Sequence, residues 1–172
     1  LFEIASVHDS FLLGLIYIVA VQLLWFLGFH GSNVLEPVSR TAFTVDGTTI
    51  FSKSFSDVFV SMGGSGTAIC IWLALILFMR KKRNGKLAGI ATIPVLFNMN
   101  EILIFGIPII LNPVLFLPFL MTPIVTYLIA YTAMWLGFVP TMTNQVVWTM
   151  PPIISGYIAT GSFGGAVLQI IC

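Results

Sequence analysis

The chain has 172 residues, of which 58% are hydrophobic and only 8% are charged, and its formal net charge is +1. A water-soluble domain carries roughly 25% charged residues, so this composition excludes an ordinary soluble protein. Each helical crossing of a bilayer needs about 20 apolar residues, so the length allows about four or five crossings and no separate soluble domain. The basic residues are clustered in the sequence, and a nucleic-acid partner is therefore not expected.

The first half of the chain contains two candidate membrane spans. Residues 11–29 have no charged side chain and are long enough to cross a bilayer. Residues 31–61 mix charged residues with Ser, Thr, Gly and Phe, and are expected to lie outside the membrane or at its interface. The second span, residues 62–79, ends at a loop from Arg80 to Lys86 that holds five of the seven basic residues. The positive-inside rule places this loop in the cytoplasm, and binding of the loop to anionic lipid gives the same sidedness.

The second half is apolar but repeatedly interrupted. Residues 87–112 contain several proline and asparagine residues, and irregular backbone at membrane depth is tolerated where protein buries it or where it lines a watery cavity. We therefore expect this stretch to be re-entrant or broken. Residues 114–138 form a long span, and the double proline at 151–152 divides the remainder into a second broken element and a terminal helix. The predicted fold is an all-α integral membrane protein with about four or five transmembrane helices and re-entrant or broken hairpin elements.

Glu101 is the strongest candidate for a functional residue. It is the only acidic residue after Asp57, and residues 102–172 contain neither a charged side chain nor a histidine. A carboxylate among apolar segments is a functional-site hypothesis, while the alternative is a surface glutamate at the cytoplasmic end of a helix. Asn98 and Asn100 precede it, and amides beside a carboxylate suit a neutral, polyhydroxylated ligand.

Other candidates are less specific when the residues are taken alone. His30 follows the first span, where a histidine is as often interfacial as functional. Trp25 and Trp148 could stack on a sugar ring, although tryptophans also anchor helices at membrane interfaces. The two histidines, His8 and His30, lie far apart and no cluster of acidic residues accompanies them. Neither a metal site nor a cofactor is therefore expected.

Several motifs resemble a known family. The segments FNMNE at 97–101 and IFGIPIILNP at 104–113 are similar to the membrane (IIC) component of the bacterial phosphotransferase system, in the lactose and cellobiose (oligo-β-glucoside) family. Supporting matches are WFLGFHG at 25–31, GGSG at 63–66 and WTMPPIISG at 148–156. The resemblance covers nearly the whole chain but only the substrate-binding second half of the family's architecture. Residues 1–172 are therefore expected to be the C-terminal half, with the N-terminal half missing.

The resemblance implies group translocation that depends on phosphoenolpyruvate. A β-linked disaccharide of the cellobiose, lactose or chitobiose class is bound outside, carried inward, and phosphorylated on its C6 hydroxyl by a phosphocysteine of a partner IIB protein. The chain is then the membrane part of a sugar phosphotransferase and is not catalytic alone. The residues expected to act in catalysis are Glu101 and His30. The expected substrate-binding residues are Glu101, His30, Asn98, Asn100, Gly31 and Trp148.

The resemblance also places the protein in the bacterial plasma membrane as a multi-pass protein, with a homodimer expected for its full-length form. An alternative function is an ion- or proton-coupled secondary transporter of a neutral solute, in which Glu101 carries the proton. A third possibility is a nonfunctional remnant of a longer transporter. The identity of the sugar does not follow from the sequence.

Overall fold

The computed structural model describes residues 2–45, 47, 49–79 and 83–172, with side chains from Phe11 onward. Every regular element among these residues is helical, which confirms the predicted all-α class for this part of the chain. The elements are α1 (Phe2–Phe26), α2 (Gly31–Val34), α3 (Glu36–Ala42), α4 (Lys53–Phe55), the π-helical η1 (Ser56–Val60), α5 (Ala68–Phe78), α6 (Arg83–Leu96), α7 (Glu101–Gly106), α8 (Pro113–Trp135), α9 (Ile154–Thr160) and α10 (Phe163–Ile171).

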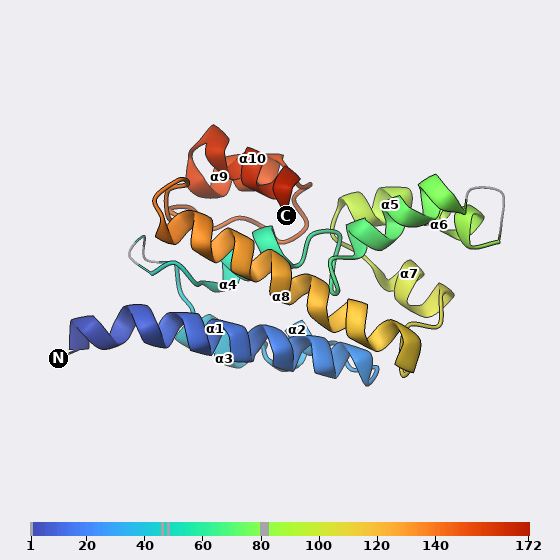
Figure 1. Cartoon of the computed structure of the whole chain (residues 1–172), viewed down its shortest axis with the longest axis horizontal. Helices are drawn as coiled ribbons and strands as arrows, with labels where there is room; N and C mark the ends of the chain where they lie inside the picture. The colour runs from blue at the N-terminus through green and yellow to red at the C-terminus, as the bar shows by residue number, and fades with distance from the viewer. Residues whose placement is uncertain (1, 46, 48, 80–82) are drawn as a thin grey trace.

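Two long helices, α1 and α8, lie side by side and antiparallel, with α8 across the middle of the molecule and α1 along its lower edge in Figure 1. The hydroxyl of Tyr127 on α8 donates a hydrogen bond to the carbonyl of Phe11 on α1 at 2.8 Å. Gly14 allows Phe51 and Tyr127 to approach the backbone of α1 closely. A Cβ atom at this position would lie 2.7 Å from the ring of Phe51 and 2.9 Å from the Tyr127 hydroxyl. The missing side chain at Gly14 thus leaves the space that both aromatic residues occupy.

Part of the segment expected to lie outside the membrane or at its interface packs into the core of the fold. Phe51, Phe55 and Phe59 are fully buried, and the rings of Phe51 and Phe55 lie 5.8 and 6.0 Å from the ring of Tyr127. Phe51 precedes α4, whereas Phe55 and Phe59 lie four residues apart on the helical stretch of α4 and η1, and all three belong to the core cluster beneath Tyr127 of α8. The second half of residues 31–61 thus contributes to the core, while the expected location of this segment outside the membrane or at its interface stays a prediction.

The predicted span at 114–138 corresponds to α8. Among the described residues, α8 is the helix that is both long and apolar enough to cross a bilayer, by length and composition, while Phe11–Phe26 and Ala68–Phe78 are shorter apolar helices. The number of crossings therefore stays a prediction. Pro118 and Pro123 remain inside the helix, and nearby threonine hydroxyls donate to their carbonyls, Thr122 at 2.7 Å and Thr126 at 3.0 Å.

The expected interruptions are present, with one shift. The chain leaves helical geometry between α6 and α7, where Asn98 has a φ of 61°, so the predicted break within residues 87–112 is confirmed. The second candidate span begins later than expected, at Ala68 instead of residue 62. Its first residues form a loop because Gly63, Gly64 and Gly66 adopt positive φ angles that glycine tolerates.

One glutamine joins the C-terminal helices to the core. The amide nitrogen of Gln169 on α10 donates to the carbonyl of Val58 in η1 at 2.7 Å. Its amide oxygen accepts hydrogen bonds from the backbone N–H groups of Ile153 at 2.6 Å and Gly156 at 2.8 Å, at the start of α9. The consecutive helices α9 and α10 therefore meet the distant η1 at this buried amide.

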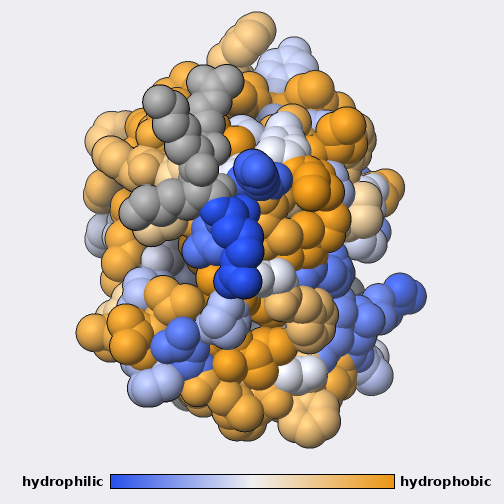
Figure 2. Space-filling view, turned by 90° about the vertical axis from the view of Figure 1, so that its right-hand side faces the viewer, coloured by the Kyte–Doolittle hydropathy of each residue, from blue (hydrophilic) through white to orange (hydrophobic). Residues whose placement is uncertain are grey.

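The end of the molecule that carries α5, α6 and α7 exposes mainly hydrophobic residues, crossed by a band of hydrophilic ones (Figure 2). Ile90, Ile93 and Phe105 are 65–70% exposed. Soluble monomers rarely expose extended apolar surface, so this surface fits a lipid or protein environment. The expected cytoplasmic loop lies partly outside the described residues, at 80–82, and its location stays a prediction.

We expect Gly14→Ala to destabilise the fold because its methyl group would overlap the Phe51 ring, and overpacking typically costs about 1–3 kcal/mol. Gly89→Ala on α6 is the matched control, since a Cβ atom there meets nothing within 4 Å. Alanine is the better helix former, so the control should unfold no earlier than the parent. Thermal unfolding in detergent measures both variants. Equal melting temperatures for the two would contradict the proposed close approach.

Candidate functional site

One polar cavity of about 250 Å³ lies between the helix interruptions. Small-molecule sites have volumes of roughly 300–1,000 Å³, so this cavity is near the lower end of that range. Loops and short helices from several parts of the chain line it. The lining residues are Trp25, His30, Ser32, Asn33, Glu36, Lys53, Asp57, Ser61, Gly64, Ser65, Asn98, Asn100, Glu101 and Trp148.

Glu101 differs from the other carboxylates of the cavity. Glu36 is paired with Arg40 at 2.7 Å, and Asp57 is paired with Lys53, whose ammonium nitrogen lies 2.6 Å from Oδ1. Within the described part of the chain, the carboxylate of Glu101 makes neither a hydrogen bond nor an ion pair. It is the first residue of α7, where the helix dipole favours a negative charge. Glu101 therefore offers the cavity an acceptor that no cation among the described residues neutralises.

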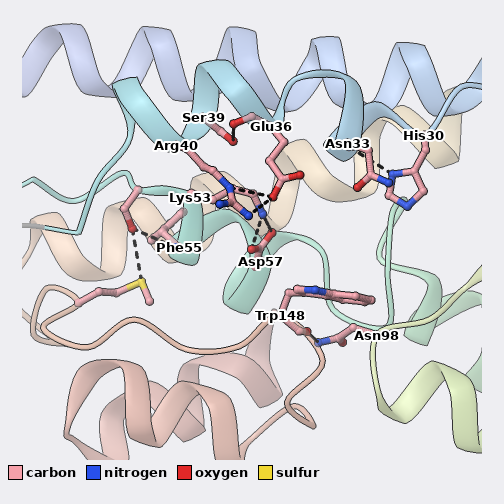
Figure 3. Close-up of polar contacts among 12 residues, drawn as sticks. His30, Asn33, Glu36, Ser39, Arg40, Lys53, Phe55, Asp57, Asn98 and Trp148 are labelled. Carbon is pink, nitrogen blue, oxygen red and sulfur yellow. Dashed lines mark hydrogen bonds and ion pairs between the residues drawn. The ribbon is translucent and has the colours of Figure 1, made fainter.

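His30 has one ring nitrogen engaged and one directed elsewhere. It caps α2, because its Nδ1 accepts a hydrogen bond from the backbone N–H of Asn33 at 3.3 Å. A neutral histidine that accepts at Nδ1 holds its proton on Nε2. In Figure 3 this second nitrogen points away from Asn33, toward the space above Trp148. The cap therefore makes neutral His30 a hydrogen-bond donor to the cavity.

The ring of Trp25 packs against the ring of His30. The two ring centroids lie 4.3 Å apart, with the planes tilted by 49°. Trp25 is only 5% exposed, and its indole Nε1 is buried with no hydrogen-bond partner among the described residues. Its packing on the imidazole fixes the orientation of His30.

The side chain of Asn98 binds backbone groups from two other segments. Its Oδ1 accepts a hydrogen bond from the N–H of Gly63 at 2.8 Å. Its Nδ2 donates to the carbonyls of Trp148 at 2.6 Å and Met150 at 3.1 Å. Both N–H donors of the amide are thus used within the protein. Asn98 was expected to hold sugar hydroxyls, but the only group left for this is the second lone pair of its Oδ1.

Asn100 fixes the glycine-rich loop. It is 2% exposed, and its Nδ2 donates to the carbonyl of Ser65 at 3.0 Å. A Cβ atom at Gly64 would lie 2.5 Å from the amide carbon of Asn100, so only glycine permits this contact. The same loop is held from α1, where the Gln22 side-chain oxygen accepts from the N–H of Gly66 at 3.0 Å. Residues 62–67, which the sequence predicted to be helical, therefore form a loop that these two hydrogen bonds hold in place.

The structure brings five of the six expected substrate-binding residues to one cavity: His30, Asn98, Asn100, Glu101 and Trp148. Trp148 is 52% exposed and lies next to Asp57 in the view of Figure 3. Gly31 is not among the lining residues. It is buried against α1, where a Cβ atom would lie 2.2 Å from the carbonyl oxygen of Val21. Gly31 therefore contributes the close approach that holds the neighbouring His30 in place.

Lys53 and Asp57 line the cavity although sequence analysis assigned them to an outer segment. Lys53 and Asp57 lie four residues apart on the helical stretch of α4 and η1. The buried Phe55 and Phe59 each follow one of them by two residues, about half a helical turn. That alternation is the signal of a helix with one buried and one polar face. The sequence contains this signal, but its charged, Ser and Thr residues favoured a segment outside the membrane or at its interface.

Comparison with known proteins identifies the family. The family model described as Phosphotransferase system, EIIC matches residues 1–123. The lichenan permease IIC component of Bacillus subtilis (strain 168) is 42% identical over 165 residues, which cover 87% of this chain and 36% of the relative. The cellobiose-specific EIIC component of Lactococcus lactis subsp. lactis is 32% identical over 192 residues, covering 91% of this chain and 39% of the relative.

A solved structure shows the same fold. The transporter ChbC, the IIC component of the N,N'-diacetylchitobiose-specific phosphotransferase system, superposes with a TM-score of 0.88 at 29% identity. The match covers 99% of this chain and 42% of ChbC, so the chain spans about two-fifths of the length of these proteins. The chain therefore belongs to the phosphotransferase system EIIC family, whose members are integral membrane proteins of the bacterial plasma membrane.

Proposed function

We propose that this chain is the substrate-binding half of a phosphotransferase-system sugar permease that binds and translocates a β-linked disaccharide. The relatives named for lichenan, cellobiose and diacetylchitobiose support a substrate of this class. The observation on which the proposal rests is the convergence of Glu101, His30 and Trp148 on one cavity, with Glu101 unpaired within the described residues. A carboxylate, a histidine N–H and an indole face are the groups that bind a neutral sugar.

In the proposed reaction the sugar is phosphorylated on its C6 hydroxyl by a phosphorylated IIB partner. The C6 oxygen bonds to phosphorus, the phosphorus–sulfur bond of the IIB phosphocysteine breaks, and the sulfur leaves as a thiolate. The hydroxyl proton goes to the carboxylate of Glu101, which acts as the general base. Phosphoryl transfer asks the protein mainly to position the reactants, and the cavity residues supply that positioning.

His30 has the complementary role in this proposal. Because Nδ1 is occupied by the N–H of Asn33, the proton of neutral His30 is on Nε2, which cannot accept a second proton. His30 therefore donates a hydrogen bond to a sugar oxygen and does not deprotonate the attacking hydroxyl. This distinction divides the two catalytic candidates into a base, Glu101, and an orienting donor, His30.

Three further features belong to the proposal. The basic loop from Arg80 to Lys86 faces the cytoplasm, where it contacts the IIB partner or anionic lipid. The full-length protein is a homodimer embedded in the bilayer by about four or five crossings of this half and by its other half. Like the transport activity, these features belong to the longer protein that the curated relatives represent, because the chain spans about two-fifths of their length.

The proposed function predicts a specific product. Membrane vesicles that contain the transporter should take up radiolabelled cellobiose only in the presence of phosphorylated IIB, and the labelled product inside should be cellobiose phosphate. Separation of the labelled products by anion-exchange chromatography measures this. Accumulation of unmodified cellobiose without IIB would contradict group translocation and would favour the proton-coupled alternative.

For the sugar site, we expect Glu101→Gln to lower the affinity for the disaccharide at least about tenfold, because a hydrogen bond to a charged acceptor is worth roughly 1.5–3 kcal/mol. Glu36→Gln is the matched control, since that carboxylate lines the same cavity but is neutralised by Arg40. Calorimetric titration in detergent measures both. Near-parental affinity in Glu101→Gln would refute the assignment.

Two variants at His30 separate its structural role from its proposed catalytic role. Asparagine can replace the capping acceptor but has no group at the Nε2 position, while alanine loses both. His30→Asn should retain thermal stability, His30→Ala should lose about 1 kcal/mol, and both should lose sugar phosphorylation. Phosphorylation at the parental rate in His30→Asn would limit His30 to capping α2.

A further inference from the structure

A second cavity, of about 320 Å³, lies outside the candidate sugar site, where α6 begins and α7 ends. It is on the face of the molecule that carries α5, α6 and α7, where hydrophilic residues adjoin hydrophobic ones (Figure 2). The first turn of α6 forms its polar part, and the next turn together with the end of α7 forms its apolar part. The lining residues are Arg83, Asn84, Lys86, Leu87, Ile90 and Gly106.

The packing of α6 fixes which of its faces presents this cavity. On one side, the indole N–H of Trp72 on α5 donates a hydrogen bond to the carbonyl of Ala88, which is fully buried, at 3.1 Å. On another side, Leu87 packs against the end of α7, where a Cβ atom at Gly106 would lie 2.6 Å from the leucine side chain. These contacts prevent rotation of α6, so the side chains that line the cavity are held in register.

The polar part of the cavity is positively charged. Arg83 and Lys86 are exposed, and within the described residues neither side chain makes an ion pair or a hydrogen bond. None of the lining residues is acidic, and the first turn of α6 contains no acidic residue. The helix dipole adds partial positive charge at the same end, so the two cations oppose the stability of this turn. A bound anion would offset that repulsion, and Asn84 supplies a neutral donor beside the charges.

The apolar part of the cavity continues along α6 as an exposed stripe. Ile90 and Ile93 follow Lys86 by four and seven residues, which places the three side chains on one side of the helix. The two isoleucines are 69% and 70% exposed. At 1.5 Å per residue, the stripe extends roughly 10 Å from the charged turn. A ligand that fits both parts has an anionic head and an apolar tail.

We propose that this cavity is a binding site for one anionic phospholipid of the cytoplasmic leaflet. Arg83 and Lys86 contact the phosphate group of the lipid, and an acyl chain lies along Ile90 and Ile93. Cationic residues beside a membrane attract anionic headgroups in this way. The inference rests on the proposed cytoplasmic location of the basic loop and specifies its partner. A water-soluble partner such as IIB would be expected to find a polar rim around the charges, and the apolar stripe favours lipid instead.

The test measures lipid binding by the full chain in detergent, using native mass spectrometry to count retained lipid molecules. The probes are phosphatidylglycerol, which is anionic, and phosphatidylcholine with the same acyl chains, which has no net charge. The parent should bind phosphatidylglycerol at least about tenfold more tightly, because two cations act on the headgroup. The double variant Arg83→Gln with Lys86→Gln should lose this preference and should keep the affinity of the parent for phosphatidylcholine.

Matched variants separate the cavity from charge in general and from fold stability. Arg83→Lys with Lys86→Arg retains both charges and should retain the preference for phosphatidylglycerol. Arg40→Gln removes an exposed cation outside this cavity and should change that affinity less than about twofold. Ile90→Asn shortens the apolar stripe and should weaken the binding of both lipids. Since all these side chains are exposed, the melting temperatures should stay close to that of the parent.

Three outcomes would overturn the inference. The first is equal affinity of the parent for the two lipids, or an unchanged preference in the double glutamine variant. The second is displacement of phosphatidylglycerol by an equal concentration of inorganic phosphate, which would make the cavity a site for the free ion. The third is an unchanged lipid preference in the double glutamine variant together with loss of IIB binding, which would assign the charges to the protein partner. The lipid assay contains neither sugar nor IIB, so its failure is distinct from failure to form cellobiose phosphate, which would contradict the proposed function.

Discussion

Interrupted helices in a membrane protein need partners for the backbone groups that the interruptions release, because lipid supplies none. The side chain of Asn98 meets this constraint at three places, since it binds the N–H of Gly63 and the carbonyls of Trp148 and Met150. The end of α6, the loop before α5 and the loop before α9 are thereby joined. The cavity exists because these interruptions meet, and Glu101 follows three residues after the asparagine that joins them.

The long apolar elements could be predicted from the sequence because length and hydrophobicity determine them directly. The span at 114–138 matches α8, and the break before Glu101 follows from its prolines and asparagines. The glycine-rich stretch at 62–67 could not be placed, because glycine is compatible with both close helix packing and a loop of positive φ. What decides between them is the contact of Gly64 with Asn100, 36 positions away in the chain.

In the candidate site, too, some residues could be predicted from local sequence and others depend on distant contacts. Glu101 and His30 were found because an isolated carboxylate in apolar sequence is unusual and because the surrounding motifs resemble a known family. Lys53 and Asp57 were assigned elsewhere, since charged residues in a Ser- and Thr-rich stretch are typical of a loop. Gln22 had no local signal, because its role depends on the N–H of Gly66 in a distant loop. Local patterns indicated candidate residues, whereas contacts between segments determined the architecture.

The amide of Gln169 connects the wall of the cavity to the C-terminal helices. It binds Val58, the residue after Asp57, and also the first backbone N–H groups of α9. Because a single rigid amide holds both sides, η1 cannot tilt without displacing α9 and α10 or breaking buried hydrogen bonds. Lys53 and Asp57 therefore lie on a segment that is joined to α9 and α10. A movement that widens the cavity on this side requires η1, α9 and α10 to shift together against α8.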